Sequence, residues 1–80
     1  MDDGAPVEVF VVDRRITVSN KSEENLVAEV YDISGRGVAK QQIERGTTSY
    51  INAGGQLPNG VYLVKMKGQE VSVDRRIMIR

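Results

Sequence analysis

The 80-residue sequence has no cysteine and no histidine. Without cysteine the chain forms no disulfide and offers no thiolate for nucleophilic catalysis. Without histidine as well, it lacks the side chains that hold nearly every zinc or transition-metal ion and the side chain most used in general acid–base catalysis. These absences argue against an enzyme, and we expect no catalytic residue, no metal site and no cofactor.

Aromatic residues and long apolar runs are also scarce. The chain has no tryptophan, one phenylalanine and three tyrosines. No apolar run approaches the roughly 18 residues that a membrane-spanning helix requires. Eleven basic and eleven acidic residues cancel, which removes the overall attraction that a dedicated nucleic-acid binder shows, so we expect no nucleic-acid partner. The first residues lack the basic and apolar regions of a signal peptide.

What the sequence does contain is a series of short segments rich in β-branched residues, separated by turn-forming residues. The expected strands cover residues 7–12, 15–18, 26–32, 38–44, 48–53, 61–66 and 71–80. This spacing, without any helical period, predicts an all-β fold: an immunoglobulin-like antiparallel β-sandwich of about seven strands, with closure into a barrel as the alternative. Residues 1–6 are expected to be a linker remnant before a single domain at residues 7–80.

Alternating apolar residues in these segments, with Ile33 and Leu57 beside them, define the expected core. Its members are Val9, Val11, Ile16, Val18, Ala28, Val30, Ile33, Ile43, Ile51, Leu57, Tyr62, Val64, Ile77 and Ile79. Tyr62 fits in a core only if its hydroxyl reaches water or an acceptor. The segment 38–44 has the polar centre expected of an edge strand, formed by Lys40, Gln41 and Gln42. Pairing of two copies through such edge strands would give a weak homodimer, which we retain as a candidate partner interaction.

Three short motifs are better explained by loops than by chemistry. Gly35-Arg36-Gly37 opens no helix, so we interpret it as a hairpin turn and not as a phosphate-binding loop. Glu23 and Glu24 are adjacent in a loop and do not face one another as the two carboxylates of a glycosidase do. Asn20-Lys21-Ser22 matches a glycosylation sequon, a triplet that is common by chance.

The pattern Val-Asp-Arg-Arg-Ile occurs twice, at residues 12–16 and 73–77. A repeat architecture needs several copies at periods of about 20–50 residues, so we interpret the two copies as strands that enter the sheet in similar ways. In the first copy, Asp13 and Arg14 are expected to form a tight turn between two strands, with a bulge as the alternative. The copies and the C-terminus concentrate five arginines, which are Arg14, Arg15, Arg75, Arg76 and Arg80. The last three either flank a solvated strand or mark a strand that a partner recognises by β-augmentation.

Three blocks of sequence occur in a distinctive order. They are Tyr31-Asp32-Ile33-Ser34-Gly35-Arg36, then LPNGVYLVKM at residues 57–66, then Arg75-Arg76-Ile77-Met78-Ile79-Arg80. Over residues 7–80 this series resembles the type A C-terminal sorting domains of the type IX secretion system, also called the Por secretion system, of Bacteroidetes. The chain departs from the family pattern at its front, where residues 10–14 take the place of a Tyr-Pro-Asn-Pro element.

The resemblance implies a non-enzymatic secretion and sorting signal that directs a cargo protein across the outer membrane and is usually removed by a sortase on cell-surface attachment. The implied partners are the outer-membrane translocon, a shuttle protein and the sortase. The implied locations are the periplasm in transit, then the outer membrane, the cell surface or the medium. The alternative is an immunoglobulin-like adhesive or carbohydrate-binding module of a surface protein.

The same resemblance implies which residues carry the signal. The family motif residues are Gly35, Arg36, Gly60, Tyr62 and Lys65, and the terminal signal is Arg76, Ile77, Met78, Ile79 and Arg80. In our interpretation Gly35, Gly60 and Tyr62 maintain the fold, while the terminal strand is what the machinery recognises. A processing point is expected within residues 2–6.

Overall fold

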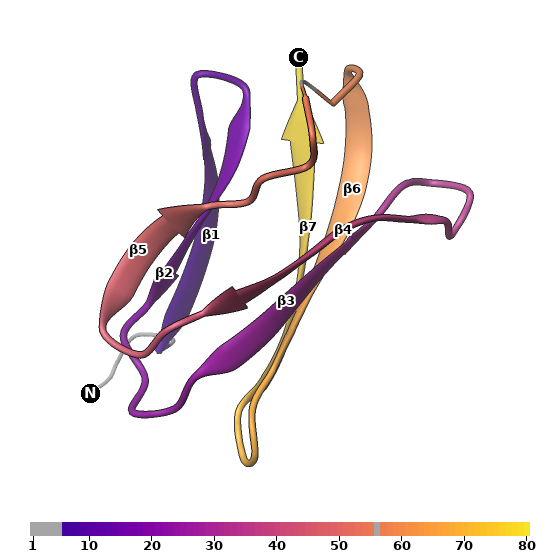
Figure 1. Cartoon of the computed structure of the whole chain (residues 1–80). Helices are drawn as coiled ribbons and strands as arrows, with labels where there is room; N and C mark the ends of the chain where they lie inside the picture. The colour runs from indigo at the N-terminus through magenta and orange to yellow at the C-terminus, as the bar shows by residue number, and fades with distance from the viewer. Residues whose placement is uncertain (1–5, 56) are drawn as a thin grey trace.

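The computed structural model describes residues 6–55 and 57–80, which form seven strands in two antiparallel sheets without any helix (Figure 1). The strands are β1 (Val7–Val12), β2 (Arg15–Asn20), β3 (Leu26–Tyr31), β4 (Gly37–Ile43), β5 (Thr47–Tyr50), β6 (Gly60–Lys67) and β7 (Ser72–Ile79). The sheets have the orders β1-β2-β5 and β4-β3-β6-β7. Because they are separate, the predicted sandwich is confirmed and the barrel is wrong. No helix in the described part is long and apolar enough to cross a membrane.

The order of strand pairing is immunoglobulin-like. β2 pairs with β5 and not with β3, its neighbour in sequence, while β3 pairs with β6 in the other sheet. Immunoglobulin domains likewise place the second and fifth strands in one sheet and the third, sixth and seventh in the other. The chain therefore crosses between the layers three times, after β2, after β4 and after β5.

Side chains from both sheets fill the space between them. The buried apolar residues are Val7, Ile16, Val18, Leu26, Ala28, Val30, Ile43, Ile51, Tyr62, Val64, Met66 and Ile79. The predicted Val9, Val11, Leu57 and Ile77 are only half-buried against this core. The prediction omits Val7, Leu26 and Met66, which lie near the ends of their strands. Its inclusion of Ile33 is wrong, because that side chain is 88% exposed.

β2 extends two residues beyond its predicted end, through Ser19 and Asn20, because both residues pair with β5. The Asn20 side chain is fully buried: its Nδ2 donates to the carbonyls of Glu24 and Ile43 at 2.9 and 3.1 Å, and its Oδ1 accepts the Ser22 amide at 3.0 Å. A buried amide with all these partners stabilises the crossing between the sheets. It also leaves the sequon asparagine inaccessible in the folded domain.

β5 is shorter than predicted, because residues 51–53 leave the strand. Gln41 of β4 takes over part of the pairing with its side-chain amide. Its Nε2 donates to the carbonyl of Tyr50 at 2.8 Å, and its Oε1 accepts the amide of Asn52 at 2.9 Å. Gln41 therefore joins the edge of the larger sheet to the end of β5, a role that its polarity alone does not reveal.

The β6–β7 hairpin packs against the loop between β2 and β3. The two Glu24 carboxylate oxygens each accept the backbone amide of Glu70 at 3.1 Å. A Cβ atom on Gly68 would lie 2.8 Å from Leu26 Cδ2 and would overlap the Glu24 carboxylate, so the close approach requires glycine. These contacts fix the hairpin at the end of the sandwich opposite the C-terminus (Figure 1).

The two Val-Asp-Arg-Arg-Ile segments have different structures, so the prediction that they enter the sheet in similar ways is wrong. Asp13 and Arg14 have φ values of 49° and 63° and form a two-residue turn between β1 and β2. Positive φ at both central residues is the geometry of a type I′ turn. The second copy, residues 73–77, lies wholly inside β7. The prediction of a tight turn at residues 13–14 is confirmed.

Candidate interaction surface

The turn between β3 and β4, residues 32–36, is held by one carboxylate. Asp32 Oδ1 accepts the Ser34 amide at 3.0 Å, the Ser34 hydroxyl at 2.6 Å and the Arg36 amide at 3.0 Å. Gly35 has a φ of 89°, which suits glycine, and donates its amide to the Asp32 carbonyl at 2.9 Å. Gly35 therefore supplies the backbone geometry that this turn uses. The hydrogen bond from the Ser34 hydroxyl and that from the Arg36 amide lower the pKa of the Asp32 carboxyl below its ordinary 3.8.

This turn presents Ile33 to solvent. The residue follows β3 directly, and its side chain is 88% exposed, more than any other large hydrophobic residue of the described chain. The alternation of β3 turns Leu26, Ala28 and Val30 inward, so it does not predict burial of Ile33, which lies beyond the strand and out of phase with these residues. The sequence does contain a signal for this exposure, because Ile33 directly precedes the turn-forming residues Ser34 and Gly35. The core prediction did not use that signal.

The start of β6 differs from this turn, because it buries its largest side chain, Tyr62. Gly60 has a φ of 154°, outside the range that other residues favour, and it delivers the chain into β6. Tyr62 is only 5% exposed, and its hydroxyl donates to the carbonyl of Pro58 at 2.6 Å. This is the arrangement of a tyrosine corner in immunoglobulin-like sandwiches. The expectation that the Tyr62 hydroxyl reaches an acceptor is confirmed.

Lys65 lies on the outer face of β6, beside the ring of Tyr31. Its Nζ is 5.9 Å from the centroid of that ring, a cation–π distance. The Tyr31 hydroxyl donates to Glu29 Oε1 at 3.0 Å, and this hydrogen bond raises the pKa of Tyr31 above its ordinary 10.0. Glu29 is also 3.9 Å from Lys40 Nζ. The outer face of the larger sheet therefore carries an ordered polar row beside apolar residues.

These parts meet around a hollow of about 710 Å³ on the outer face of the larger sheet. Its lining comes from the 32–36 turn and from β3, β6 and β7. The lining residues are Tyr31, Asp32, Ile33, Gly35, Val61, Tyr62, Leu63, Lys65 and Arg76. The structure thus brings together three predicted motif residues, Gly35, Tyr62 and Lys65, and one residue of the predicted terminal signal, Arg76. We call this lining the outer-face surface.

The other predicted site residues are not part of this lining, and they lie either on the exposed side of the domain or in its core. Arg36 lies on the same turn, with its Nε 3.5 Å from an Asp32 oxygen and its side chain 78% exposed. On β7, Met78 stands opposite Val61 and is 51% exposed, whereas Ile79 is buried. Ile77 is half-buried against the core, and Arg80 is exposed beyond the end of β7. The five terminal residues are therefore not one surface.

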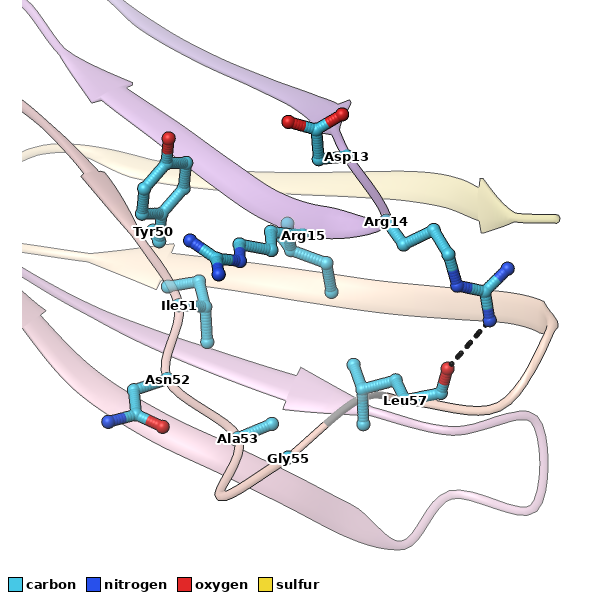
Figure 2. Close-up of a pocket in the computed structure, with 10 residues that line it drawn as sticks. Asp13, Arg14, Arg15, Tyr50, Ile51, Asn52, Ala53, Gly55 and Leu57 are labelled. Atoms are coloured by element: carbon cyan, nitrogen blue, oxygen red, sulfur yellow. Dashed lines mark hydrogen bonds between the residues drawn. The ribbon is translucent and has the colours of Figure 1, made fainter.

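A second hollow, of about 590 Å³, lies beside the β1–β2 turn and holds the first arginine pair (Figure 2). Arg14 extends toward Leu57 and donates to its carbonyl at 3.4 Å. Arg15 points the other way, with its guanidinium carbon 4.9 Å from the centroid of the Tyr50 ring. Because the two guanidinium groups diverge and each contacts the protein, they do not converge on a common ligand (Figure 2). The five arginines predicted as one concentration are distributed over separate surfaces.

Comparison with known proteins identifies the family. A family model described as the secretion system C-terminal sorting domain matches residues 12–80. The match starts at the last residue of β1 and includes all the strands after it. A search of curated proteins gives no match. The matched family is not a family of enzymes, and a signal of this kind implies interaction with the secretion machinery. The chain belongs to the secretion system C-terminal sorting domains, and it is a type IX sorting signal that directs export toward the outer membrane, the cell surface or the medium.

Proposed function

We propose that the type IX machinery recognises this domain as a folded unit, that the outward side chains of β7 are part of what is recognised, and that a sortase afterwards removes the domain from its cargo. The proposed partners are the outer-membrane translocon, a shuttle protein and the sortase, met during periplasmic transit and at the cell surface. The observation that carries the proposal is the family match, which includes the whole of β7.

The position of β7 supports its proposed role. Within the part of the chain that the structure describes, β7 is an edge strand of the larger sheet that pairs only with β6, and β1 of the smaller sheet packs beside it. Its residues alternate, with Arg76 and Met78 facing outward while Ile77 and Ile79 face the core. A partner can therefore contact β7 through its outward side chains without unfolding the domain.

An adhesive or carbohydrate-binding module is the second candidate, but the aromatic side chains do not support it. Sugars stack on open aromatic faces, and here Arg15 lies over the Tyr50 ring while Lys65 lies beside that of Tyr31. Tyr62 is buried, and Phe10 stands 40% exposed on the smaller sheet. No platform of adjacent open rings exists among the described residues.

The proposal is tested by fusing residues 1–80 to a periplasmic reporter in a strain with type IX secretion. We expect the fusion to reach the cell surface or medium and the unfused reporter to remain periplasmic. Retention of the intact fusion in the periplasm would refute the sorting role.

Variants of β7 then test what is recognised. The outward double variant Met78→Ser/Arg80→Ala should keep the melting temperature of the parent and reduce export. Ile79→Ala is the matched inward control, and it should cost about 2–5 kcal/mol of stability because it leaves a cavity in the core. A deletion of residues 77–80 would not separate these effects, because it removes a core residue together with the outward ones. Unchanged export of the double variant would exclude these outward side chains as the signal.

Two further parts of the proposal have their own measurements. A processing point within residues 2–6, of which residues 2–5 lie outside the described part, predicts a released domain that begins there. Mass spectrometry of that product tests it, and an N-terminus inside β1 contradicts it. A weak homodimer through edge strands predicts a concentration-dependent sedimentation coefficient, and one mass at all concentrations contradicts it.

A further inference from the structure

We propose that the outer-face surface docks a protein of the export machinery that offers an apolar cleft flanked by carboxylates, with Ile33 as the side chain that enters the cleft. This inference rests on the proposed function and specifies the partner chemistry of the domain. It concerns a residue in the 32–36 turn, which is separate in sequence from the terminal strand.

Ile33 has the properties of an anchor residue. Its side chain is 88% exposed, so nearly all of its apolar area remains available for burial by a partner. Fully burying such a side chain strengthens binding by about 10- to 100-fold. The turn that carries it projects from the body of the sandwich (Figure 1). It is therefore accessible to a partner without movement of either sheet.

The turn is ordered before any partner binds. The Asp32 carboxylate accepts three hydrogen bonds from within the turn. Two backbone hydrogen bonds also close the turn: the Gly35 amide donates to the Asp32 carbonyl, and the Asp32 amide donates to the Arg36 carbonyl. A side chain held on such a turn loses little backbone freedom on binding, which favours affinity. An exposed isoleucine on a mobile loop would not have this advantage.

Apolar neighbours extend the contact area beyond Ile33. Tyr31, Val61 and Leu63 are each half-buried and line the same hollow, and Met78 stands beside Val61 on β7. Together they form a continuous outer patch at one end of the larger sheet. A central apolar patch of this kind is typical of the core of a protein–protein interface.

The charges around the patch indicate the charge of the partner. Lys65 and Arg76 line the hollow, and neither forms an ion pair among the residues that the structure describes. The carboxylate of the lining, Asp32, already accepts hydrogen bonds from its own turn. Glu29 and Asp74 stand opposite Lys65 in the strand register, but its ammonium group lies beside the Tyr31 ring. Carboxylates on the partner would complement the two cations.

The same features favour a protein over other acidic partners. The net charge of the chain is zero, and two cations beside an apolar patch do not form the basic stripe that a phosphate backbone requires. An apolar anchor surrounded by a charged rim is the usual design of a protein interface. The partner is therefore expected to bury Ile33 and to pair with the cations at the rim.

The test substitutes Ile33 in the exported reporter fusion. Ile33→Asp should reduce export at least tenfold, because it places a carboxylate in an acidic, apolar cleft, and Ile33→Leu should retain export within twofold. Ile33→Ser removes the same apolar area without introducing a charge. All three variants should unfold at the parent temperature, since the side chain is exposed.

Val27→Asp is the matched control. Val27 is 38% exposed on the same outer face but lies near the other end of β3, opposite Lys67. Its aspartate variant should be exported within twofold of the parent. Parent-level export of both Ile33→Asp and Ile33→Ser would overturn the docking inference while leaving the sorting role intact. Equal losses for Ile33→Asp and Val27→Asp would also overturn it, because the effect would not be local. Failure of the unmodified fusion to be exported would overturn both proposals.

Discussion

Residues 12–16 and 73–77 have the same five-letter sequence and different structures. In the first copy Asp13 and Arg14 have positive φ values and turn the chain between β1 and β2. In the second, the equivalent Asp74 and Arg75 continue an eight-residue strand beside β6. Left-handed backbone costs a non-glycine residue roughly 1–2 kcal/mol, so the local sequence does not favour the turn by itself.

The difference arises from what surrounds each copy. On either side of Asp13 and Arg14, β1 and β2 pair residue by residue. These two residues must therefore turn the chain so that Val12 stands opposite Arg15. The second copy faces an uninterrupted partner, because Val64 stands opposite Arg75 in a continuous ladder. Pairing with the neighbouring strand therefore decides the backbone of both segments, and the arginines end in different environments. Substitutions at equivalent positions of the two copies separate the effect of sequence from that of strand pairing.

The largest expected difference concerns the isoleucine that ends each copy. Ile16 is 2% exposed in the core, whereas Ile77 is half-buried on an edge strand. Ile16→Ala should reduce the free energy of unfolding by about 3–4 kcal/mol, and Ile77→Ala by about 1–2 kcal/mol, because less apolar area is lost at the edge. Urea denaturation measures both. Equal losses would mean that β7 is buried as deeply as β2.

The next prediction makes one replacement at both sites and expects opposite signs. Asp13→Asn/Arg14→Gly should stabilise the domain by about 1 kcal/mol, since Asn-Gly suits a type I′ turn and relieves the positive φ of the non-glycine residues. Asp74→Asn/Arg75→Gly should destabilise it by about 1 kcal/mol, because glycine weakens a strand interior. The change in thermal midpoint of each variant measures this. The same sign at both sites would contradict the assignment of a turn and a strand.

The architecture could be predicted from the sequence because its signals are local. Alternating apolar residues mark the strands, as Ala28 and Val30 do in β3, and glycines mark most of the turns. The burial of Tyr62 and the need of its hydroxyl for an acceptor also followed from local pattern and chemistry. Both are confirmed by the hydrogen bond to Pro58.

What could not be predicted depends on contacts between distant residues. Asn20 looks like a loop residue, and its burial depends in part on a hydrogen bond to the Ile43 carbonyl, 23 positions away. Gly68 has an ordinary turn sequence, and its requirement for glycine comes from Glu24 and Leu26. Ile33 was misplaced because its apolar character was weighed above its position in the Asp32 turn, beyond β3 and out of phase with the inward residues of that strand. The outer-face surface was therefore missed as a unit, although three of its residues were predicted as motif residues.

The 32–36 turn differs from the turn at Asp13 and Arg14, because the side chain of Asp32 holds it through hydrogen bonds within the turn. Hydrogen bonds lower the pKa of Asp32, so their contribution is present above the ordinary value of 3.8 and is lost as the pH falls through the lower pKa of the folded state. The amide resonances of Ser34 and Arg36 should therefore titrate with a midpoint below pH 3.8. NMR titration measures this. In Asp32→Asn these shifts should not titrate, and a midpoint above 3.8 in the parent would contradict the prediction.

The smallest expected changes in stability concern the second arginine of each copy, Arg15 and Arg76. These two arginines are expected to differ most clearly in their effect on export. Arg15 stacks on Tyr50, so Arg15→Ala should cost about 0.5–1 kcal/mol through the lost cation–π contact and leave export of the reporter unchanged. Arg76 lines the outer-face surface, so Arg76→Ala should change stability by less than about 0.5 kcal/mol and reduce export severalfold. Thermal unfolding and the exported fraction of the reporter measure the two effects in the same variants. If Arg15→Ala impaired export as much as Arg76→Ala, the hollow beside the β1–β2 turn would belong to the recognised surface. If only Arg76→Ala impairs it, two arginines with identical neighbours in sequence differ in function because the fold packs one against a ring and leaves the other to a partner.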